Sequence, residues 1–226
     1  MVRVEICANS VASAVNAMRG GADRIELCQN LAEGGVTPSA ALIDYCVSRL
    51  GLRTHVLVRP RPGDFCYSEA EQEVIAGDIL AARRLGASAV VVGCLTREGR
   101  VDRPLLQRWV DLAGNMEVTF HRAFDLCSHP EEDLQALIDC GCRRVLTSGQ
   151  AAHAFDGRSR LGRWVRQVGG RIDILAGCGI TPENVRQIVV ETGVTEVHGS
   201  CKHTVDGRIE TDCATVRRLV EAVSDL

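Results

Sequence analysis

The sequence predicts a closed parallel (β/α)8 barrel, the TIM-barrel architecture, formed by residues 1–226 as one α/β domain. Strand-like segments alternate with helix signals or loops eight times along the chain, which is typical of this fold. A length of 226 residues with 46% hydrophobic content suits one large core. Apolar and polar side chains also alternate along several strands, so polar groups would face a shared interior. A doubly wound open sheet is the alternative, but it would not need polar groups on so many strand faces.

Local patterns place the first four strands and the helices that follow them. Asn9 or Ser10 caps the first helix, and Thr37-Pro38 opens the second. A capping box of Ser68 and Glu71 opens a long third helix. The strands themselves are expected at residues 3–7, 24–28, 53–58 and 89–92.

The second half of the chain repeats this alternation. A capping box of Ser128 and Glu131, with Pro130 between them, opens the fifth helix. Thr181-Pro182 opens the seventh helix, and the last helix begins near Asp212. The remaining strands are expected at residues 118–121, 144–146, 172–175 and 196–198.

Alternate polar side chains of the first, second and eighth strands are predicted to face the barrel interior. They are Glu5, Cys7, Glu26, Cys28, Glu196, His198 and Ser200. Buried carboxylates need cationic partners, because an unpaired buried charge is costly. The candidate partners are Arg24, His55, Arg59 and Arg122. Ion pairs that only stabilise the barrel would explain these carboxylates equally well.

The end of the fifth strand carries the densest group of functional side chains. His121, Arg122 and Asp125 follow a buried strand and precede a helix, where α/β proteins place their active sites. His121 is the candidate general acid or base and Arg122 an anion-binding group. Asp125 and the interior Glu26 complete the predicted catalytic set. The alternative is that these residues are hydrogen-bonded structural groups.

Loops after the later strands predict an anion site. Backbone N–H groups of the loops after strands seven and eight bind phosphate in many such barrels. The candidate residues are Ser148 and Gly149 after the sixth strand, Gly177 and Gly179 after the seventh, and Gly199 and Ser200 after the eighth. These glycines could instead serve only tight turns.

The third strand ends in a second candidate anion-binding segment. Arg59 and Arg61 alternate there with Pro60 and Pro62, and the prolines limit the freedom of the segment. Two guanidinium groups at this spacing would hold an anionic ligand.

Cys7 and Cys28 occupy equivalent places at the ends of two adjacent strands. Neighbouring strands lie about 4.8 Å apart, so the two sulfurs could meet within roughly 5 Å. Thiolates suit Cu(I), and Zn²⁺ also accepts them. The alternative is that both cysteines are small hydrophobic residues of the interior.

Composition limits the classes of function. A net charge of −3 with few aromatic residues gives no support for binding to nucleic acid or a membrane surface. The first residues enter a strand pattern directly, so we expect no signal peptide and a cytoplasmic protein. Eleven cysteines are then expected as thiols, and no organic-cofactor motif or structural zinc motif is evident.

Several runs of residues resemble the CutC family, which is named for copper homeostasis, and they follow its order over nearly the whole chain. They are Glu5-Ile6-Cys7, Arg24-Ile25-Glu26-Leu27-Cys28, Gly34-Gly35-Val36-Thr37-Pro38-Ser39, Arg59-Pro60-Arg61, Gly63-Asp64-Phe65, Thr119-Phe120-His121-Arg122-Ala123-Phe124-Asp125, Leu146-Thr147-Ser148-Gly149 and His198-Gly199-Ser200. The resemblance implies a TIM barrel, a cytoplasmic homo-oligomer, a link to copper tolerance, and Cu(I) binding at Cys7 and Cys28. One departure is Cys178, where the family usually has glycine.

Two functions from different classes therefore stay open. The resemblance implies a copper homeostasis protein that binds a copper ion. The residues at the barrel mouth favour an enzyme of lyase or isomerase type that acts on a small phosphorylated or carboxylated metabolite. Whether the chain is an enzyme is not decided by the sequence.

Overall fold

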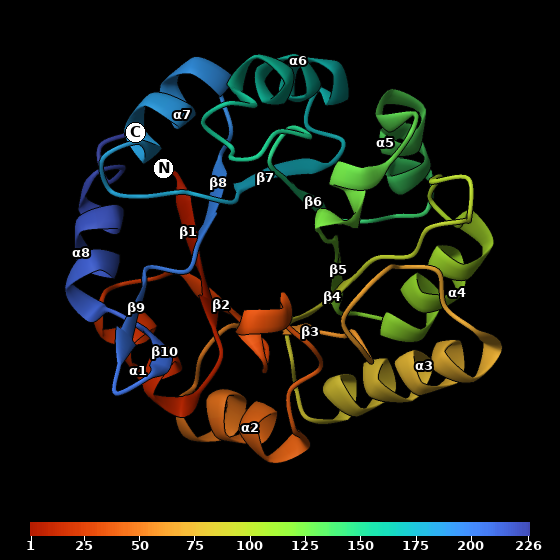
Figure 1. Cartoon of the computed structure of the whole chain (residues 1–226), viewed down its shortest axis with the longest axis horizontal. Helices are drawn as coiled ribbons and strands as arrows, with labels where there is room; N and C mark the ends of the chain where they lie inside the picture. The colour runs from red at the N-terminus through yellow and green to blue at the C-terminus, as the bar shows by residue number, and fades with distance from the viewer.

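Eight parallel strands form a closed barrel in which each strand pairs with the next and β8 pairs with β1 (Figure 1). The computed structural model describes residues 1–226. The closed ring confirms the predicted (β/α)8 fold and excludes the open sheet. The strands are β1 (Arg3–Ala8), β2 (Arg24–Leu27), β3 (Thr54–Leu57), β4 (Ala89–Val92), β5 (Glu117–Phe120), β6 (Arg144–Thr147), β7 (Asp173–Gly177) and β8 (Glu196–Gly199).

Helices surround the barrel and bury their apolar faces on the outward side of the strands (Figure 1). None of them is long and apolar enough to cross a membrane. The helices are α1 (Val11–Arg19), α2 (Ala40–Asp44), α3 (Glu69–Arg84), α4 (Arg103–Ala113), α5 (Pro130–Asp139), α6 (Arg158–Val168), α7 (Val185–Thr192) and α8 (Cys213–Glu221).

Hydrogen bonds at the helix starts confirm several of the predicted caps. Ser10 caps α1 and Asp212 caps α8, each by accepting an N–H from the first turn. Ser68 and Glu71 form the complete capping box of α3. The backbone donors of these helix ends are therefore satisfied by the residues that the sequence indicated.

Three predicted helix starts are wrong. Thr181-Pro182 leads into a turn, and α7 begins after Asn184. In the other two, the predicted capping hydroxyl is used elsewhere. Ser39 caps α2 in place of Thr37, whose hydroxyl exchanges hydrogen bonds with the backbone of Arg59. Ser128 does not cap α5, because its hydroxyl donates to the carbonyl groups of residues 98 and 99. A short hairpin of β9 (Lys202–Val205) and β10 (Arg208–Thr211), which lies outside the eight predicted strands, precedes α8.

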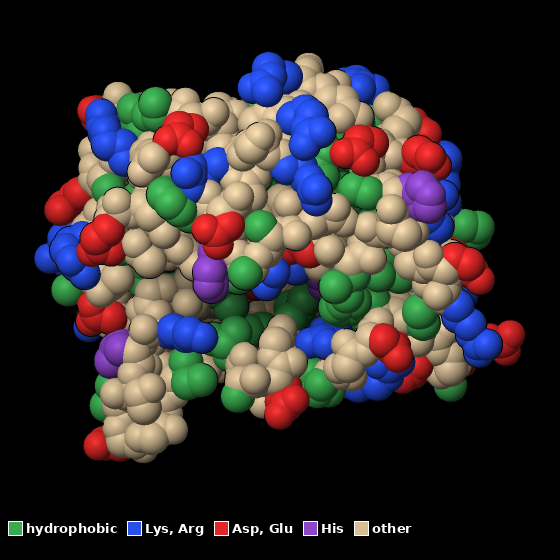
Figure 2. All heavy atoms as spheres, turned by 45° about the horizontal axis from the view of Figure 1, so that its top comes forward, with side chains coloured by type: hydrophobic (Ala, Val, Ile, Leu, Met, Phe, Trp, Pro, Cys, Tyr) green, Lys and Arg blue, Asp and Glu red, His purple; other side chains and the backbone are tan.

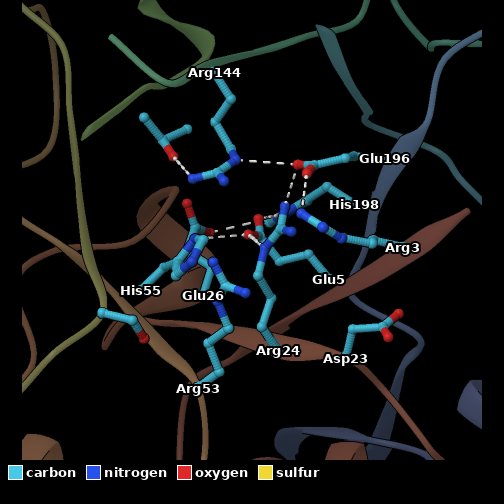
Figure 3. A network of polar contacts seen from close by, with 12 residues as sticks. Arg3, Glu5, Asp23, Arg24, Glu26, Arg53, His55, Arg144, Glu196 and His198 are labelled. Atoms are coloured by element: carbon cyan, nitrogen blue, oxygen red, sulfur yellow. Dashed lines mark hydrogen bonds and ion pairs between the residues drawn. The ribbon is translucent and has the colours of Figure 1, made fainter. Parts of the chain in front are cut away.

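The barrel interior contains a network of buried ion pairs, as Figure 3 shows. Arg24 joins Glu5 and Glu196, with its Nε 2.5 Å from Glu5 and its terminal nitrogen 2.6 Å from Glu196. Arg144 lies 3.0 Å from Glu196 and 2.7 Å from Glu117. The inward parity predicted for Glu5 and Glu196 is confirmed, and so is Arg24 as a partner.

Of the other predicted partners of the interior carboxylates, one is confirmed and two are wrong. His55 Nδ1 contacts Glu5 at 3.0 Å, as expected. Arg59 and Arg122 are not partners of these carboxylates, because each is bound near its own loop. Arg144, which is not among the predicted partners, takes their place in the network.

Candidate functional site

A cavity of about 860 Å³ opens at the end of the barrel where the strands terminate. Its wall includes residues that lie in or after β1, β2, β3, β5, β6, β7 and β8. Figure 2 shows this face of the molecule, with a hollow whose floor is hydrophobic and whose edge carries Lys or Arg side chains. The location is the one at which barrels of this fold carry their active sites.

Glu5 does not line the cavity, but it contacts His198, which does (Figure 3). Its carboxylate accepts a hydrogen bond from His198 Nδ1 at 2.7 Å and is paired with Arg24 on its other oxygen. Burial alone would raise the pKa of Glu5. The contacts with His198, His55 and Arg24 nevertheless hold this pKa well below its usual value. Glu5 is therefore an anion that fixes the orientation of the His198 ring.

The thiols of Cys7 and Cys28 lie together at the cavity wall, with 3.7 Å between the two sulfur atoms. Both side chains are buried, and their apolar neighbours are Leu31, Leu57 and Val91. The predicted proximity of the two sulfurs is confirmed. The hydrogen bond with Cys28, together with burial, raises the pKa of Cys7 well above its usual value.

Cys7 also belongs to a second group of donor atoms. Cys7 Sγ, a carboxylate oxygen of Glu26 and a ring nitrogen of His198 all lie within 4.8 Å of one another. Burial alone would lower the pKa of His198, but the carboxylates of Glu26 and Glu5 and the Cys7 contact hold it well above its usual value. Sequence reasoning placed all three side chains inside the barrel but did not identify His198 as a ligand. The available signal was its inward parity on β8.

His121 is a neutral hydrogen-bond donor at the cavity wall. Its Nδ1 accepts the N–H of Ala123 at 3.1 Å, so the proton of the neutral ring is on Nε2, and this atom has no partner in the chain. Burial and the nearby Arg59 lower the pKa of His121 to about 3. The ring packs 4.8 Å from Phe65, and a Cβ at Gly93 would lie 2.2 Å from it. The Nε2 atom is itself buried, so the ring borders the cavity while its unpaired N–H is enclosed by the protein.

Arg122 and Asp125 form an ion pair at 2.8 Å on the short 3-10 helix η3 (Arg122–Leu126). Asp125 also accepts hydrogen bonds from the hydroxyl groups of Thr147 and Ser148 and from the N–H of Gln150. Both members of the pair line the cavity, but Asp125 is largely used to hold the loop after β6.

The two predicted arginine clamps are engaged by their own loops. Arg59 lines the cavity and donates to the carbonyl groups of Glu33, Gly35 and Gly63. Arg61 is paired with Glu71 at 2.5 Å and with Asp64 at 3.0 Å, and it does not line the cavity. The structure therefore brings Arg59 to the site and leaves Arg61 outside it.

The predicted anion loops reach the cavity in part. Gly179, Gly199 and Ser200 line it, whereas Ser148, Gly149 and Gly177 pack behind it. The N–H groups of residues 178, 179, 180 and 200 donate to no acceptor in the chain. Cys178 has a φ of 80°, a conformation that favours glycine, and this matches the position at which the sequence departs from the family pattern.

The sequence matches the model of one protein family and members of the same family. The model of the CutC family matches residues 2–203. A CutC family protein of Bacteroides thetaiotaomicron is 47% identical over 202 residues, which is 89% of this chain and 81% of that protein. A similar relative from Porphyromonas gingivalis is 46% identical over 204 residues, 90% of this chain and 82% of that protein.

Solved structures agree with these matches. A protein of Streptococcus agalactiae, assigned as a copper homeostasis protein CutC, superposes with a TM-score of 0.85 and 31% identity over 88% of this chain and 99% of its own. The phosphoribosyl anthranilate isomerase of Thermotoga maritima has a TM-score of 0.65 at 16% identity and covers 100% of both chains. At that identity the likeness shows the fold alone.

Proposed function

Because this chain belongs to the CutC family, we propose that it is a cytoplasmic copper homeostasis protein that binds Cu(I) through Cys7 and Cys28. The observation that carries the proposal is the distance of 3.7 Å between their sulfur atoms. One ion can contact both sulfurs after small movements of the side chains. Two thiolates in a buried, mostly apolar setting are the soft donor set that Cu(I) prefers.

The state of the other cysteines supports a reducing compartment. All eleven cysteines are free thiols. Of the other nine, only Cys178 and Cys201 also line the cavity, and neither contacts another thiol, so the Cys7 and Cys28 pair is distinguished by its geometry. Self-association, which the family resemblance implies, stays a prediction.

Replacement of both cysteines by serine is expected to weaken Cu(I) binding by more than about 100-fold, since even indirect supports of metal ligands contribute about 10–100-fold. Binding is measured anaerobically on reduced protein by competition with a chromophoric Cu(I) chelator. The control is Cys66→Ser with Cys213→Ser, which removes two thiols that do not line the cavity. Undiminished Cu(I) binding in Cys7→Ser with Cys28→Ser would count against the proposal.

A second candidate function is an enzyme that acts on a small phosphorylated or carboxylated metabolite. It is favoured by the unpaired N–H groups of the loops after β7 and β8. Lys202, the only lysine of the chain, lines the same side of the cavity and has no ion-pair partner. In this reading the anion is held there, in a cavity whose wall also includes the neutral His121 ring.

Millimolar phosphate is expected to raise the melting temperature if this anion site exists, because a ligand that binds only the folded state stabilises it. Lys202→Gln should reduce the increase, and Lys202→Arg should retain most of it because the charge is kept. Differential scanning fluorimetry measures both. No stabilisation of the wild-type protein by phosphate would contradict the anion site while leaving the Cu(I) proposal untouched.

A further inference from the structure

We propose that the cavity holds a second metal site, formed by Cys7, Glu26 and His198, that binds a borderline divalent cation such as Zn²⁺. This site shares Cys7 with the Cu(I) pair. It does not use the Cys28 thiol, because its other two donors are a carboxylate oxygen and a ring nitrogen. It does not depend on whether the chain binds copper. The proposal goes beyond copper homeostasis, because it gives the protein a centre of the kind that metalloenzymes use.

The three donor atoms are already close to a coordinating arrangement. They lie within 4.8 Å of one another, and His198 Nε2 is 3.7 Å from the nearer Glu26 oxygen. A tetrahedral ion with bonds of about 2.0–2.3 Å keeps its ligand atoms roughly 3.5 Å apart. Only small side-chain movements are then needed to close around an ion. The donors come from, or directly border, three adjacent strands, β8, β1 and β2, which hold their backbones in fixed register.

Glu26 gives an independent reason to place a cation at this position. Its side chain is more than nine-tenths buried and lines the cavity, and the hydrogen-bond donor beside its carboxylate is the weak one of the Cys7 thiol. Its one charged contact is His198 at 3.7 Å, which is beyond hydrogen-bond range. A buried carboxylate with only a weak donor is costly. A cation bound between Glu26, His198 and Cys7 would satisfy it.

His198 is oriented as a metal-binding histidine usually is. Its Nδ1 is bonded to Glu5 at 2.7 Å, and its Nε2 lies 3.7 Å from Glu26 (Figure 3), in the group of donor atoms that includes Cys7 Sγ. A carboxylate on the far nitrogen fixes the ring and increases the basicity of the coordinating one. Glu5 is itself held by Arg24 through a buried ion pair at 2.5 Å. The ring of His198 is therefore oriented by Glu5, and Glu5 is in turn held by Arg24.

The donor set selects the class of ion, and the cavity sets what else can bind. When Zn²⁺ binds, the Cys7 thiol and the His198 ring each release a proton to solvent. The resulting thiolate, imidazole and carboxylate suit Zn²⁺ or a similar divalent cation, whereas Cu(I) prefers the two sulfurs. Three protein ligands leave a fourth position, and all three residues line the cavity of about 860 Å³. A water molecule or an oxygen atom of a small ligand fits that position, which is the arrangement of catalytic rather than structural zinc sites.

The test separates the two metal sites by their unshared ligands. Reduced protein is titrated anaerobically with Zn²⁺ alone and with Cu(I) alone, each against a chromophoric chelator. Glu26→Gln and His198→Gln should each weaken Zn²⁺ binding by about tenfold or more and change Cu(I) binding by less than about threefold. Cys28→Ser should do the reverse, and Cys7→Ser should weaken both.

Co²⁺ provides a second readout, because a Co²⁺–thiolate bond gives a near-ultraviolet charge-transfer band. The band should survive Cys28→Ser and disappear in Cys7→Ser. Glu26→Gln keeps the fold testable even if His198→Gln disturbs Glu5, since Glu26 loses only the weak contact with the Cys7 thiol and the His198 contact at 3.7 Å. The proposal is overturned if Zn²⁺ binding is absent, if it survives Glu26→Gln and His198→Gln, or if it is lost in Cys28→Ser. If the wild-type protein binds Zn²⁺ but not Cu(I), only the copper site is refuted.

Discussion

Arg24→Met is expected to lower the free energy of unfolding by about 3–5 kcal/mol, because it leaves buried carboxylates without their partner. Arg24 is 1% exposed and is the cation shared by Glu5 and Glu196. Glu196 retains Arg144, but Glu5 would keep only histidine contacts. Methionine fills similar volume, so the loss would be mainly electrostatic. Urea unfolding followed by circular dichroism measures it.

Arg53→Met is the matched control for this experiment. Arg53 makes the same kind of contact, 3.2 Å from Glu117, but its side chain is 44% exposed. Exposed ion pairs contribute about 0–1 kcal/mol, and Glu117 keeps its contact with the buried Arg144. Equal losses in the two variants would show that the interior network has no special role in stability.

Lowering the pH from about 7.5 to about 4.5 is expected to cost the wild-type protein roughly 2–3 kcal/mol through His121 alone. The folded ring has a pKa of about 3, whereas an unfolded histidine titrates near 6.5. Between these values the unfolded chain binds a proton that the folded chain refuses. Stability therefore falls as the pH drops through about 6.5 and levels off only below about 3. Protonation would also break the hydrogen bond that Ala123 donates to the ring.

His121→Asn isolates this contribution. The amide oxygen can still accept the N–H of Ala123, but the side chain does not titrate. The difference in unfolding free energy between the two pH values should shrink by about 2–3 kcal/mol relative to wild type. His129→Asn, which removes an exposed imidazole, should leave the difference unchanged. An unchanged difference in His121→Asn would mean that the ring is protonated or solvated in the folded protein.

The fold could be predicted because its signals are local. Strand alternation has a period of two residues, so the inward direction of Glu5, Glu26 and His198 could be read from their neighbours alone. The proximity of Cys7 and Cys28 followed from the same parity, because their strands are consecutive in sequence and adjacent in the sheet. These predictions needed no knowledge of contacts between distant segments.

The errors concern side chains whose partners come from elsewhere. Arg61 was expected at the cavity, but Glu71 from the first turn of α3 holds it outside. Thr37 resembles a helix cap in sequence, yet the backbone of Arg59 binds its hydroxyl. Arg144 was missed because nothing next to it in the sequence shows that Glu196 and Glu117 lie across the barrel.

The divalent site could be predicted only in part for a further reason. Parity says that a side chain faces inward, but not at what height along the barrel axis it lies. The level at which Cys7, Glu26 and His198 meet depends on the stagger between β8, β1 and β2. That stagger is a property of the closed ring.

Closure of the ring between β8 and β1 also determines when the residues of each proposed metal site come together during synthesis. Glu5 and His198 are separated by 193 residues, so a chain emerging from the ribosome presents the Cys7 and Cys28 thiols long before the imidazole exists. Contacts of this sequence separation form late, because the intervening segment must be ordered first. On the two proposals above, the thiol pair is therefore synthesised early, whereas the divalent site is complete only after β8 joins β1.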